Sequence, residues 1–519
     1  MVDLSRVRER FVELSPSEFF YRNREIAGFT NPSRALFSAL RELIENSMDA
    51  CELHRIPPDI YANIALEEKI AANTGIYKLR VQDNGSGIPQ KEILNAFGRV
   101  FYSTKYVLRQ SRGTFGLGGT LALLYGQITT HKPIHVVSST GGKKIHSYVF
   151  LIDIERNRPQ IVENRNMENK RGWHGTIVEF SLVGNYPRIS NKITSYLKHT
   201  AVVAPYAEIK FVDPLGRLYF FRRTIKDVPK PPKETKPHPH GVDVERLKKM
   251  VKQGGPQKTL MEFMCLDFHR VGERTAEKFL SYAGLKPDRK LFKLTVEEIA
   301  QLSRALGTYE DFLPPRPDML SPIGEDFFRE GIRKEYELGP TDFLEVVTRP
   351  SASYSGHPFI IEAALAYGGN IRGSSGEIIL HRYANKIPLL FDEGSDVSLK
   401  IINDINWNYY KKPTDGPLAF FIHICSTKIP FRSLGKEFIA DIPEVEREIR
   451  AAVRFLLRRL STYAGRAERR KRITKRIGIY YKYLPKIAEF SSKLAETDSV
   501  PSIERLIERV KKKFEGVKD

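Results

Sequence analysis

The sequence has few cysteines and no long apolar segment. Its 519 residues include only Cys51, Cys265 and Cys425, which lack the spacing of a metal site or of a disulfide framework. No hydrophobic run approaches the length of a transmembrane helix, and the first residues lack the apolar core of a secretory signal. These absences exclude disulfide-rich secreted proteins and membrane proteins. We expect a cytoplasmic protein with reduced cysteines and no membrane partner.

Acidic residues are scarce relative to basic ones. The chain has 62 Asp and Glu against 83 Lys and Arg, a formal charge of +21. Such an excess favours a polyanionic partner, and duplex DNA is the natural candidate. Heat-adapted proteins also carry many charges, but their acids rise together with their bases. A hydrophobic content of 41% is typical of globular proteins, and the length predicts several domains.

Two common phosphate-binding motifs are also missing. The sequence has no Walker A loop, and no dinucleotide glycine motif follows a predicted strand. It does have a glycine-rich segment at 113–119, followed by the apolar run 121–125. Free backbone N–H groups beside a helix N-terminus form an anion cradle. A flexible surface loop is the alternative for this segment on its own.

A helix is predicted to begin at Asn31 and Pro32, a good N-cap followed by proline in the first turn. Its buried stripe comprises Leu36, Leu40, Leu43, Ile44 and Cys51. Glu42 and Asn46 are four residues apart and therefore project from one face. A positioned glutamate can deprotonate water, and an amide oxygen suits Mg²⁺. In isolation, this spacing is more often a solvated polar edge.

A strand over 78–82 is predicted to end at Asp83, before the glycines at 85 and 87. A carboxylate at that position can accept a hydrogen bond from the exocyclic amine of adenine. Gly85 and Gly87 would let the ring approach the backbone. A simple turn explains this segment equally well by itself. Three such segments, in this order within the first 120 residues, favour a nucleotide pocket.

Together the three segments resemble the Bergerat-type ATP site of the GHKL superfamily, which includes gyrase, heat-shock chaperones, MutL-type repair proteins and histidine kinases. The resemblance implies that Glu42 is the general base, Asn46 the Mg²⁺ ligand and Asp83 the adenine-reading carboxylate, with Gly87 beside it. It also implies an ATP lid formed by Gly113, Thr114, Phe115, Gly116, Leu117, Gly118, Gly119 and Thr120. The implied cofactors are ATP and Mg²⁺.

Further segments resemble the B subunit of archaeal topoisomerase VI, spread over about residues 10–485. They are 96–100, 103–106, 356–359, 382–388 and 426–430. The resemblance places Thr104 and Lys105 at the nucleotide. It also implies that Lys436 reaches the γ-phosphate in a catalytic role, with Lys428 as second choice. The lid departs from the family at Gly119–Thr120, where a bulkier residue and a lysine are expected.

The chain is predicted to be an α+β protein with proline-rich breaks at 229–233 and 314–317. With the resemblance, these breaks predict four parts. They are a Bergerat-type ATPase sandwich at 1–237, a helix-two-turn-helix insert at 238–313, an α/β transducer domain with a long C-terminal helix at 314–480, and a helical tail at 481–519. The insert either meets DNA phosphates or serves as a spacer. The basic stretch 466–472 either grips DNA or keeps an exposed helix soluble.

The implied function is that of the ATPase subunit of a type IIB DNA topoisomerase. Two copies would dimerise on binding ATP and gate the passage of duplex DNA. A separate A subunit would make the break, in an A2B2 heterotetramer, because nothing in this sequence resembles a cleaving module. A MutL-like repair clamp or a chaperone of the same superfamily is one alternative, although neither predicts the helical insert. An inactive DNA-binding scaffold is the other, and the intact Glu42, Asn46 and Asp83 argue against it.

Overall fold

The computed structural model describes residues 13–113, 116–410, 412–413, 416–431, 437–497 and 499–515. The N-terminal unit contains an eight-stranded sheet with the order β5-β4-β3-β6-β2-β1-β7-β8. Its neighbouring strands are antiparallel except β1 and β7. The strands are β1 (Asp59–Lys69), β2 (Gly75–Gln82), β3 (Ile134–Thr140), β4 (Lys144–Asp153), β5 (Arg158–Glu168), β6 (His174–Gly184), β7 (Glu208–Val212) and β8 (Leu218–Phe221).

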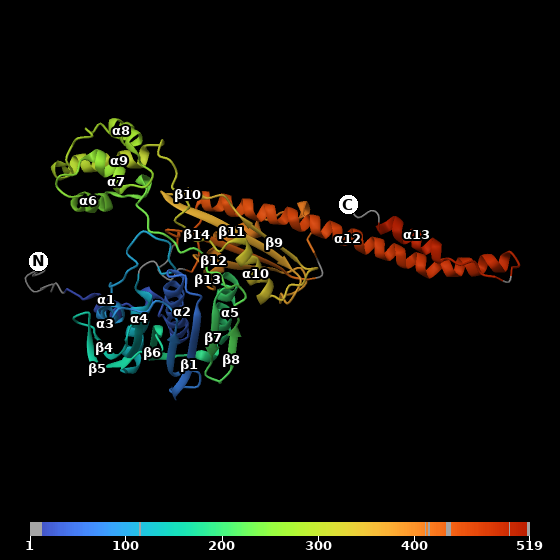
Figure 1. The fold of residues 1–519 in the computed structure, drawn as a ribbon, viewed down its shortest axis with the longest axis horizontal. Coiled ribbons are helices and arrows are strands. Elements are labelled where there is room, and N and C mark those ends of the chain that lie inside the picture. The colour runs from blue at the N-terminus through green and yellow to red at the C-terminus, as the bar shows by residue number, and fades with distance from the viewer. Residues whose placement is uncertain are drawn as a thin grey trace, which may run out of the picture.

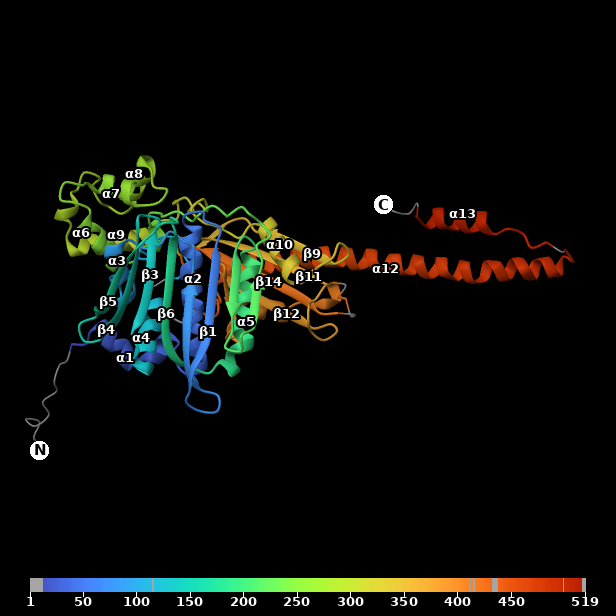
Figure 2. The same ribbon diagram turned by 60° about the horizontal axis from the view of Figure 1, so that its bottom comes forward.

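Helices cover one face of this sheet (Figures 1 and 2). They are α1 (Pro16–Arg22), α2 (Pro32–Glu52), α3 (Gln90–Gly98), α4 (Gly118–Thr130) and α5 (Tyr186–Val203), with a short 3₁₀ turn η2 (Arg24–Ala27) after α1. The start of α2 was predicted correctly. The Asn31 side chain accepts a hydrogen bond from the backbone N–H of Arg34, which satisfies one free donor of the first turn.

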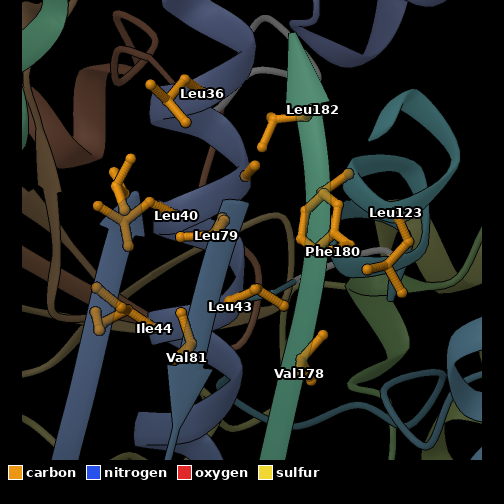
Figure 3. Packing of buried hydrophobic residues seen from close by; sticks show 14 of the residues in the cluster. Leu36, Leu40, Leu43, Ile44, Leu79, Val81, Leu123, Val178, Phe180 and Leu182 are labelled. Carbon is orange, nitrogen blue, oxygen red and sulfur yellow. The ribbon is translucent and has the colours of Figure 1, made fainter. Parts of the chain in front are cut away.

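The core between α2 and the sheet follows the predicted periodicities. Leucines and an isoleucine from one side of α2 meet alternate residues of β2 and β6, and Leu123 of α4 closes the layer (Figure 3). Leu43, Ile44, Leu79 and Phe180 are almost completely buried. Each such side chain contributes roughly 1.5–3 kcal/mol of burial free energy. This packing fixes the rotation of α2 and therefore the direction in which its polar residues point.

The segment that follows β8 has no helix or strand until residue 239. A separate group of helices then forms its own hydrophobic core, which includes Leu247, Phe263, Phe279 and Leu302. The elements are η3 (Pro239–Gly241), α6 (Val244–Gln253), α7 (Leu260–Asp267), α8 (Glu273–Tyr282), η4 (Leu291–Lys293) and α9 (Val296–Thr308). This group protrudes at one end of the molecule (Figure 1). The predicted helical insert is confirmed.

The C-terminal unit contains a mixed six-stranded sheet with the order β10-β11-β14-β12-β13, and β9 also pairs with β11. The strands are β9 (Phe343–Thr348), β10 (Ala352–Tyr354), β11 (His357–Tyr367), β12 (Ile378–Ala384), β13 (Ile387–Leu389) and β14 (Leu418–Ser426). The helices are α10 (Glu325–Glu335), η5 (Glu393–Ser395), α11 (Val397–Asn403), η6 (Trp407–Tyr409), α12 (Pro443–Leu494) and α13 (Glu504–Glu515). Helix α10 and strand β13 of this unit both contact α5 of the N-terminal unit, and these contacts join the two units.

Helix α12 has 52 residues and two different halves. Its first part buries Val445, Ile449, Val453 and Leu456 against the C-terminal sheet, as the periodicity predicts. Its second part extends away from the body of the molecule (Figures 1 and 2). The boundary proposed at 480/481 falls inside this helix, which continues without interruption to Leu494. In the part of the chain that the structure describes, no helix is long and apolar enough to cross a membrane.

Candidate nucleotide site

Helix α2 brings Glu42 and Asn46 against the first turn of α4. A side chain at Gly118 would overlap the carboxylate of Glu42, and a Cβ at Gly119 would lie 3.0 Å from Nδ2 of Asn46. Only glycine therefore lets the N-terminus of α4 approach so closely. The free N–H groups of that first turn carry partial positive charge and suit an anion.

Arg41 is the neighbour that pairs with Glu42. Its Nη2 lies 3.2 Å from Oε1 of Glu42, and its Nε lies 3.5 Å from Oε1 of Glu45. All three side chains are largely shielded from water. Only 8% of the surface of Glu42 is exposed. Arg41 was not predicted as a site residue, although it directly precedes Glu42 in the sequence.

Asp83 lies directly after β2 and is held by several donors. Its Oδ1 accepts from the backbone N–H groups of Gly85 (2.9 Å) and Thr176 (3.1 Å). Its Oδ2 accepts from the hydroxyl of Ser47 (2.9 Å), which follows Asn46 on α2. Burial raises the pKa of the Asp83 carboxyl, and these donors oppose that effect. A carboxylate has about four acceptor positions, so Oδ2 keeps one for a further donor such as an amine.

The glycines after Asp83 are explained by protein packing. A Cβ on Gly85 would lie 2.9 Å from the Cβ of Ala50 on α2. Gly87 has φ of +67°, and a Cβ there would run into the backbone carbonyl of Ser139 on β3. We predicted instead that these glycines leave room for a ring. In the structure, the room that the missing side chains leave is filled by α2 and β3.

Lys105 lies under the predicted lid. Its ammonium group donates to Oδ1 of Asn46 (2.8 Å) and to Oδ2 of Asp49 (2.9 Å). A Cβ on Gly113 would lie 2.8 Å from the same ammonium nitrogen, so Gly113 at the start of the lid lies directly against it. Gly116, with φ of +60°, packs against Ser103. The structure thus brings the segment around Lys105, the lid and α2 together.

The other predicted site residues have less direct placements. Thr104 is exposed beside Lys105, Leu117 is the N-cap of α4, and Thr120 is buried in its first turn. Thr114, Phe115 and Lys436 lie outside the described residues.

Two acidic residues and an arginine near Lys105 were not predicted as site residues. Arg112 Nη1 lies 3.0 Å from Oδ1 of Asp49, and its Nη2 lies 2.6 Å from Oε1 of Glu52. Burial alone would raise the pKa of Asp49, but the charges of Lys105 and Arg112 lower it below its ordinary value. Asp49 and Glu52 follow Asn46 at three and six positions. That spacing places both carboxylates near Asn46 on the helix and could have identified them as site residues.

The loop expected to carry the sensing lysine is described at its two ends. Lys428 is exposed after β14. Burial, together with the charge of Lys428, lowers the pKa of His357 to about 4. At the other end, Glu437 forms an ion pair with Arg34 in the first turn of α2. The end of the loop next to Lys436 is therefore tied to the helix that carries Glu42.

The residues around Asn46 fit a magnesium-bound triphosphate. No group of three or more acidic, histidine or cysteine side chains among the described residues could hold a metal ion. Mg²⁺ usually keeps several waters and shares phosphate oxygens, so one amide oxygen from the protein is enough. Asn46 would supply that oxygen, and Lys105 and the α4 N-terminus would supply positive charge for phosphates.

Comparison with known proteins shows which protein families the two units match. Residues 34–171 match the family of histidine kinase-, DNA gyrase B- and HSP90-like ATPases, so the first domain is an ATPase of the GHKL class, which implies ATP binding. Residues 315–476 match the transducer of the topoisomerase VI B subunit. We refer below to the N-terminal unit as the ATPase domain and to the C-terminal unit as the transducer.

Relatives cover nearly the whole chain. The B subunit of type 2 DNA topoisomerase 6 from Saccharolobus islandicus is 44% identical over 483 residues, which is 93% of this chain and 90% of the relative. The protein of the same name from Saccharolobus solfataricus has the same identity and coverage. The chain therefore belongs to the topoisomerase VI B-subunit family, and it is the ATPase-bearing component of that ATP-dependent type II class. Among solved structures, the B subunit of DNA gyrase from Myxococcus xanthus is 11% identical with a TM-score of 0.42, covering 85% of this chain and 95% of that one.

Proposed function

We propose that this chain binds and hydrolyses ATP at the site between α2, α4 and the Asp83 loop, and that hydrolysis drives passage of duplex DNA. The observation that supports this most strongly is the convergence of Glu42, Asn46 and the glycines of the α4 N-terminus. The transducer match and the relatives favour this function over a repair clamp or a chaperone. The same convergence argues against an inactive DNA-binding scaffold.

In this mechanism Glu42 accepts the proton of the attacking water, and Arg41 stabilises the carboxylate. Asp83 accepts a hydrogen bond from the adenine amine through its free Oδ2 position. Asn46 holds the divalent cation by its amide oxygen. When bound, Mg²⁺ neutralises charge on the triphosphate. Lys105 and the first-turn N–H groups of α4 bind the phosphate oxygens.

Lys436 is proposed to sense the γ-phosphate from the transducer. The ion pair between Glu437 and Arg34 supports this role, because it ties the adjacent end of the loop to α2. A lysine on such a loop loses its partner after hydrolysis, which would release the transducer. ATP binding would also close two copies of the chain into a dimer.

The partner of this chain is proposed to be an A subunit that cleaves both strands, in an A2B2 complex. The charge of +21 supports contact with duplex DNA. The exposed second half of α12, which contains the basic stretch 466–472, offers one surface for that contact. With ATP, the complex would relax supercoils and decatenate DNA.

The test is relaxation of supercoiled plasmid by the full chain mixed with an A subunit. We expect relaxation with Mg-ATP, and none when ATP, Mg²⁺ or either protein is left out. The control variant is Glu345→Gln. Glu345 forms a partly exposed ion pair with Arg459 in the transducer, so this variant should relax DNA normally. Relaxation that proceeds equally well without ATP would refute the coupling of hydrolysis to strand passage.

A further inference from the structure

A series of buried charges crosses the boundary between the ATPase domain and the transducer. It begins at Lys386, in the two-residue turn between β12 and β13, where Asn385 and Lys386 both have positive φ (47° and 66°). This geometry is that of a type I′ hairpin turn. The ammonium group of Lys386 donates to Oε2 of Glu52 at 3.4 Å and to the hydroxyl of Ser321 at 3.2 Å. Lys386 therefore reaches from the transducer to the C-terminal end of α2.

The backbone of this turn is held firmly. The N–H of Lys386 donates to Nε2 of His423 (3.0 Å), whose Nδ1 lies 2.8 Å from the carboxylate of Glu362. Asn385 donates to the carbonyl oxygen of Ser111 (3.2 Å), just before the lid. The side chain of Lys386 is only 2% exposed. Its position is therefore set by the transducer core and not by chance packing at a surface.

From Glu52 the contacts continue to the nucleotide site. Glu52 pairs with Arg112 at 2.6 Å, Arg112 with Asp49 at 3.0 Å, and Asp49 with Lys105 at 2.9 Å. Lys105 ends the series on Oδ1 of Asn46. Three cations and two carboxylates form this group, an excess of one positive charge. That balance is favourable only as long as each buried carboxylate keeps a cation.

ATP binding must disturb this balance. Under the proposed function, Oδ1 of Asn46 holds a divalent cation, and an ammonium group on the same oxygen would repel it. Lys105 must then leave Asn46 and Asp49 and turn to the phosphates. Asp49 keeps Arg112, which it shares with Glu52. The hydroxyl of Tyr206 also donates to Oε1 of Glu52 at 2.6 Å, but it carries no charge. Without a second cation, Asp49 and Glu52 would then share the charge of one guanidinium beside an incoming polyanion.

We propose that Lys386 is a positioning residue for nucleotide binding. Its charge, contributed by the transducer, compensates Glu52, so that Arg112 can hold Asp49 when Lys105 moves to the phosphates. By linkage, ATP binding in turn strengthens the contact between Glu52 and Lys386 and so tightens the ATPase domain against the transducer. This inference rests on the proposed roles of Asn46 and Lys105.

The test measures the Kd of the full chain for a non-hydrolysable ATP analogue with Mg²⁺. Lys386→Met should raise that Kd about tenfold, within the range usual for coupled sites. The double variant Lys386→Met with Glu52→Gln should regain most of the affinity, because it restores the charge balance. Glu52→Gln alone should bind at least as tightly as the unmodified chain. A role of Lys386 in packing alone, independent of its charge, would not be rescued by neutralising Glu52.

Arg349→Met provides the matched control. Arg349 pairs with Glu448 at 3.1 Å, inside the transducer, and should leave the Kd unchanged. If Lys386→Met does not fold, Lys386→Arg, which keeps the charge, and Glu52→Gln still test the inference. Both should then bind the analogue normally or more tightly, and a marked loss of affinity in either would overturn it.

Two results would overturn the inference while leaving ATP binding intact. One is an unchanged Kd in Lys386→Met, and the other is a double variant as weak as Lys386→Met alone. Failure of the proposed function is distinguishable. It would show as no Mg²⁺-dependent binding by the unmodified chain, or as no effect of Lys105→Met.

Discussion

Replacement of Glu42 by glutamine is the most direct test of the hydrolytic site. Glutamine keeps the size of the side chain, which matters because Gly118 lies directly against the carboxylate. It removes the ability to take a proton from water. General-base catalysis contributes typically about 10²–10⁴-fold, so kcat should fall by that factor. The corresponding increase in the activation barrier is about 2.7–5.4 kcal/mol.

The same substitution should cost little nucleotide affinity. The substitution removes none of the described hydrogen bonds of Asn46, Asp83 and Lys105, which are proposed to hold the nucleotide. Folding stability should fall modestly, because Arg41 loses one charged partner but keeps Glu45 at 3.5 Å. A hydrogen bond to a charged group contributes about 1.5–3 kcal/mol, which is an upper limit here.

The assay is steady-state phosphate release at saturating Mg-ATP, with the analogue Kd and the thermal unfolding midpoint measured in parallel. Glu45→Gln is the matched control, because Glu45 also pairs with Arg41. The charge of Glu45 also raises the pKa of Tyr196 on α5. The control should lose stability and keep kcat. If Glu42→Gln hydrolyses ATP as fast as Glu45→Gln, Glu42 is not the base.

Three further predictions concern recognition, pH and DNA. Asp83→Asn should weaken ATP binding by about 1–3 kcal/mol and reduce the preference for ATP over GTP in competition. The amide oxygen would stay with the two backbone N–H donors, and the amide nitrogen would replace Oδ2, the atom proposed to accept from the adenine amine; an unchanged preference would contradict adenine reading. Burial lowers the pKa of His199 to about 3. Between that pH and about 6.5, the unfolded chain therefore binds a proton at this histidine that the folded chain does not. On acidification through this range, His199 should lower the free energy of unfolding by up to roughly 1.4 kcal/mol per pH unit. Denaturant titrations should show a shallower loss in His199→Gln, and the same loss in both proteins would refute this assignment. Affinity for duplex DNA should fall by orders of magnitude between about 50 and 200 mM salt, with a smaller slope when the basic residues of 466–472 are neutralised, whereas a salt-independent affinity would exclude phosphate contacts.

Much of the fold was predictable because its signals are local. The start of α2, the alternation in β2 and the buried stripe of α12 each depend on residues within a few positions of one another. The same is true of the insert, whose helices begin at capping residues such as Thr259 and Thr295. The candidate residues Glu42 and Asn46 were found in the same way, from spacing on one helix.

The partners of those residues could not be predicted in this way. Ser47 and Thr176 donate to Asp83 from a helix and from a distant strand, and no periodicity connects them. The glycines at 85 and 87 were singled out as leaving room for a ring, but the atoms that fill their space belong to α2 and β3. A short sequence pattern shows that close approach is required, but not which part of the chain approaches.

The amino-acid order alone thus determined where some elements begin, such as α2, which faces are apolar, and which side chains are chemically able to serve a nucleotide. Tertiary structure decided which of them meet. The ammonium group of Lys386 reaches Glu52 across 334 residues of sequence, and Arg112 joins that pair to Asp49. Such contacts arise only when separately folded layers pack, because backbone preferences act over a few residues, whereas buried charges must find partners wherever the packed chain places them.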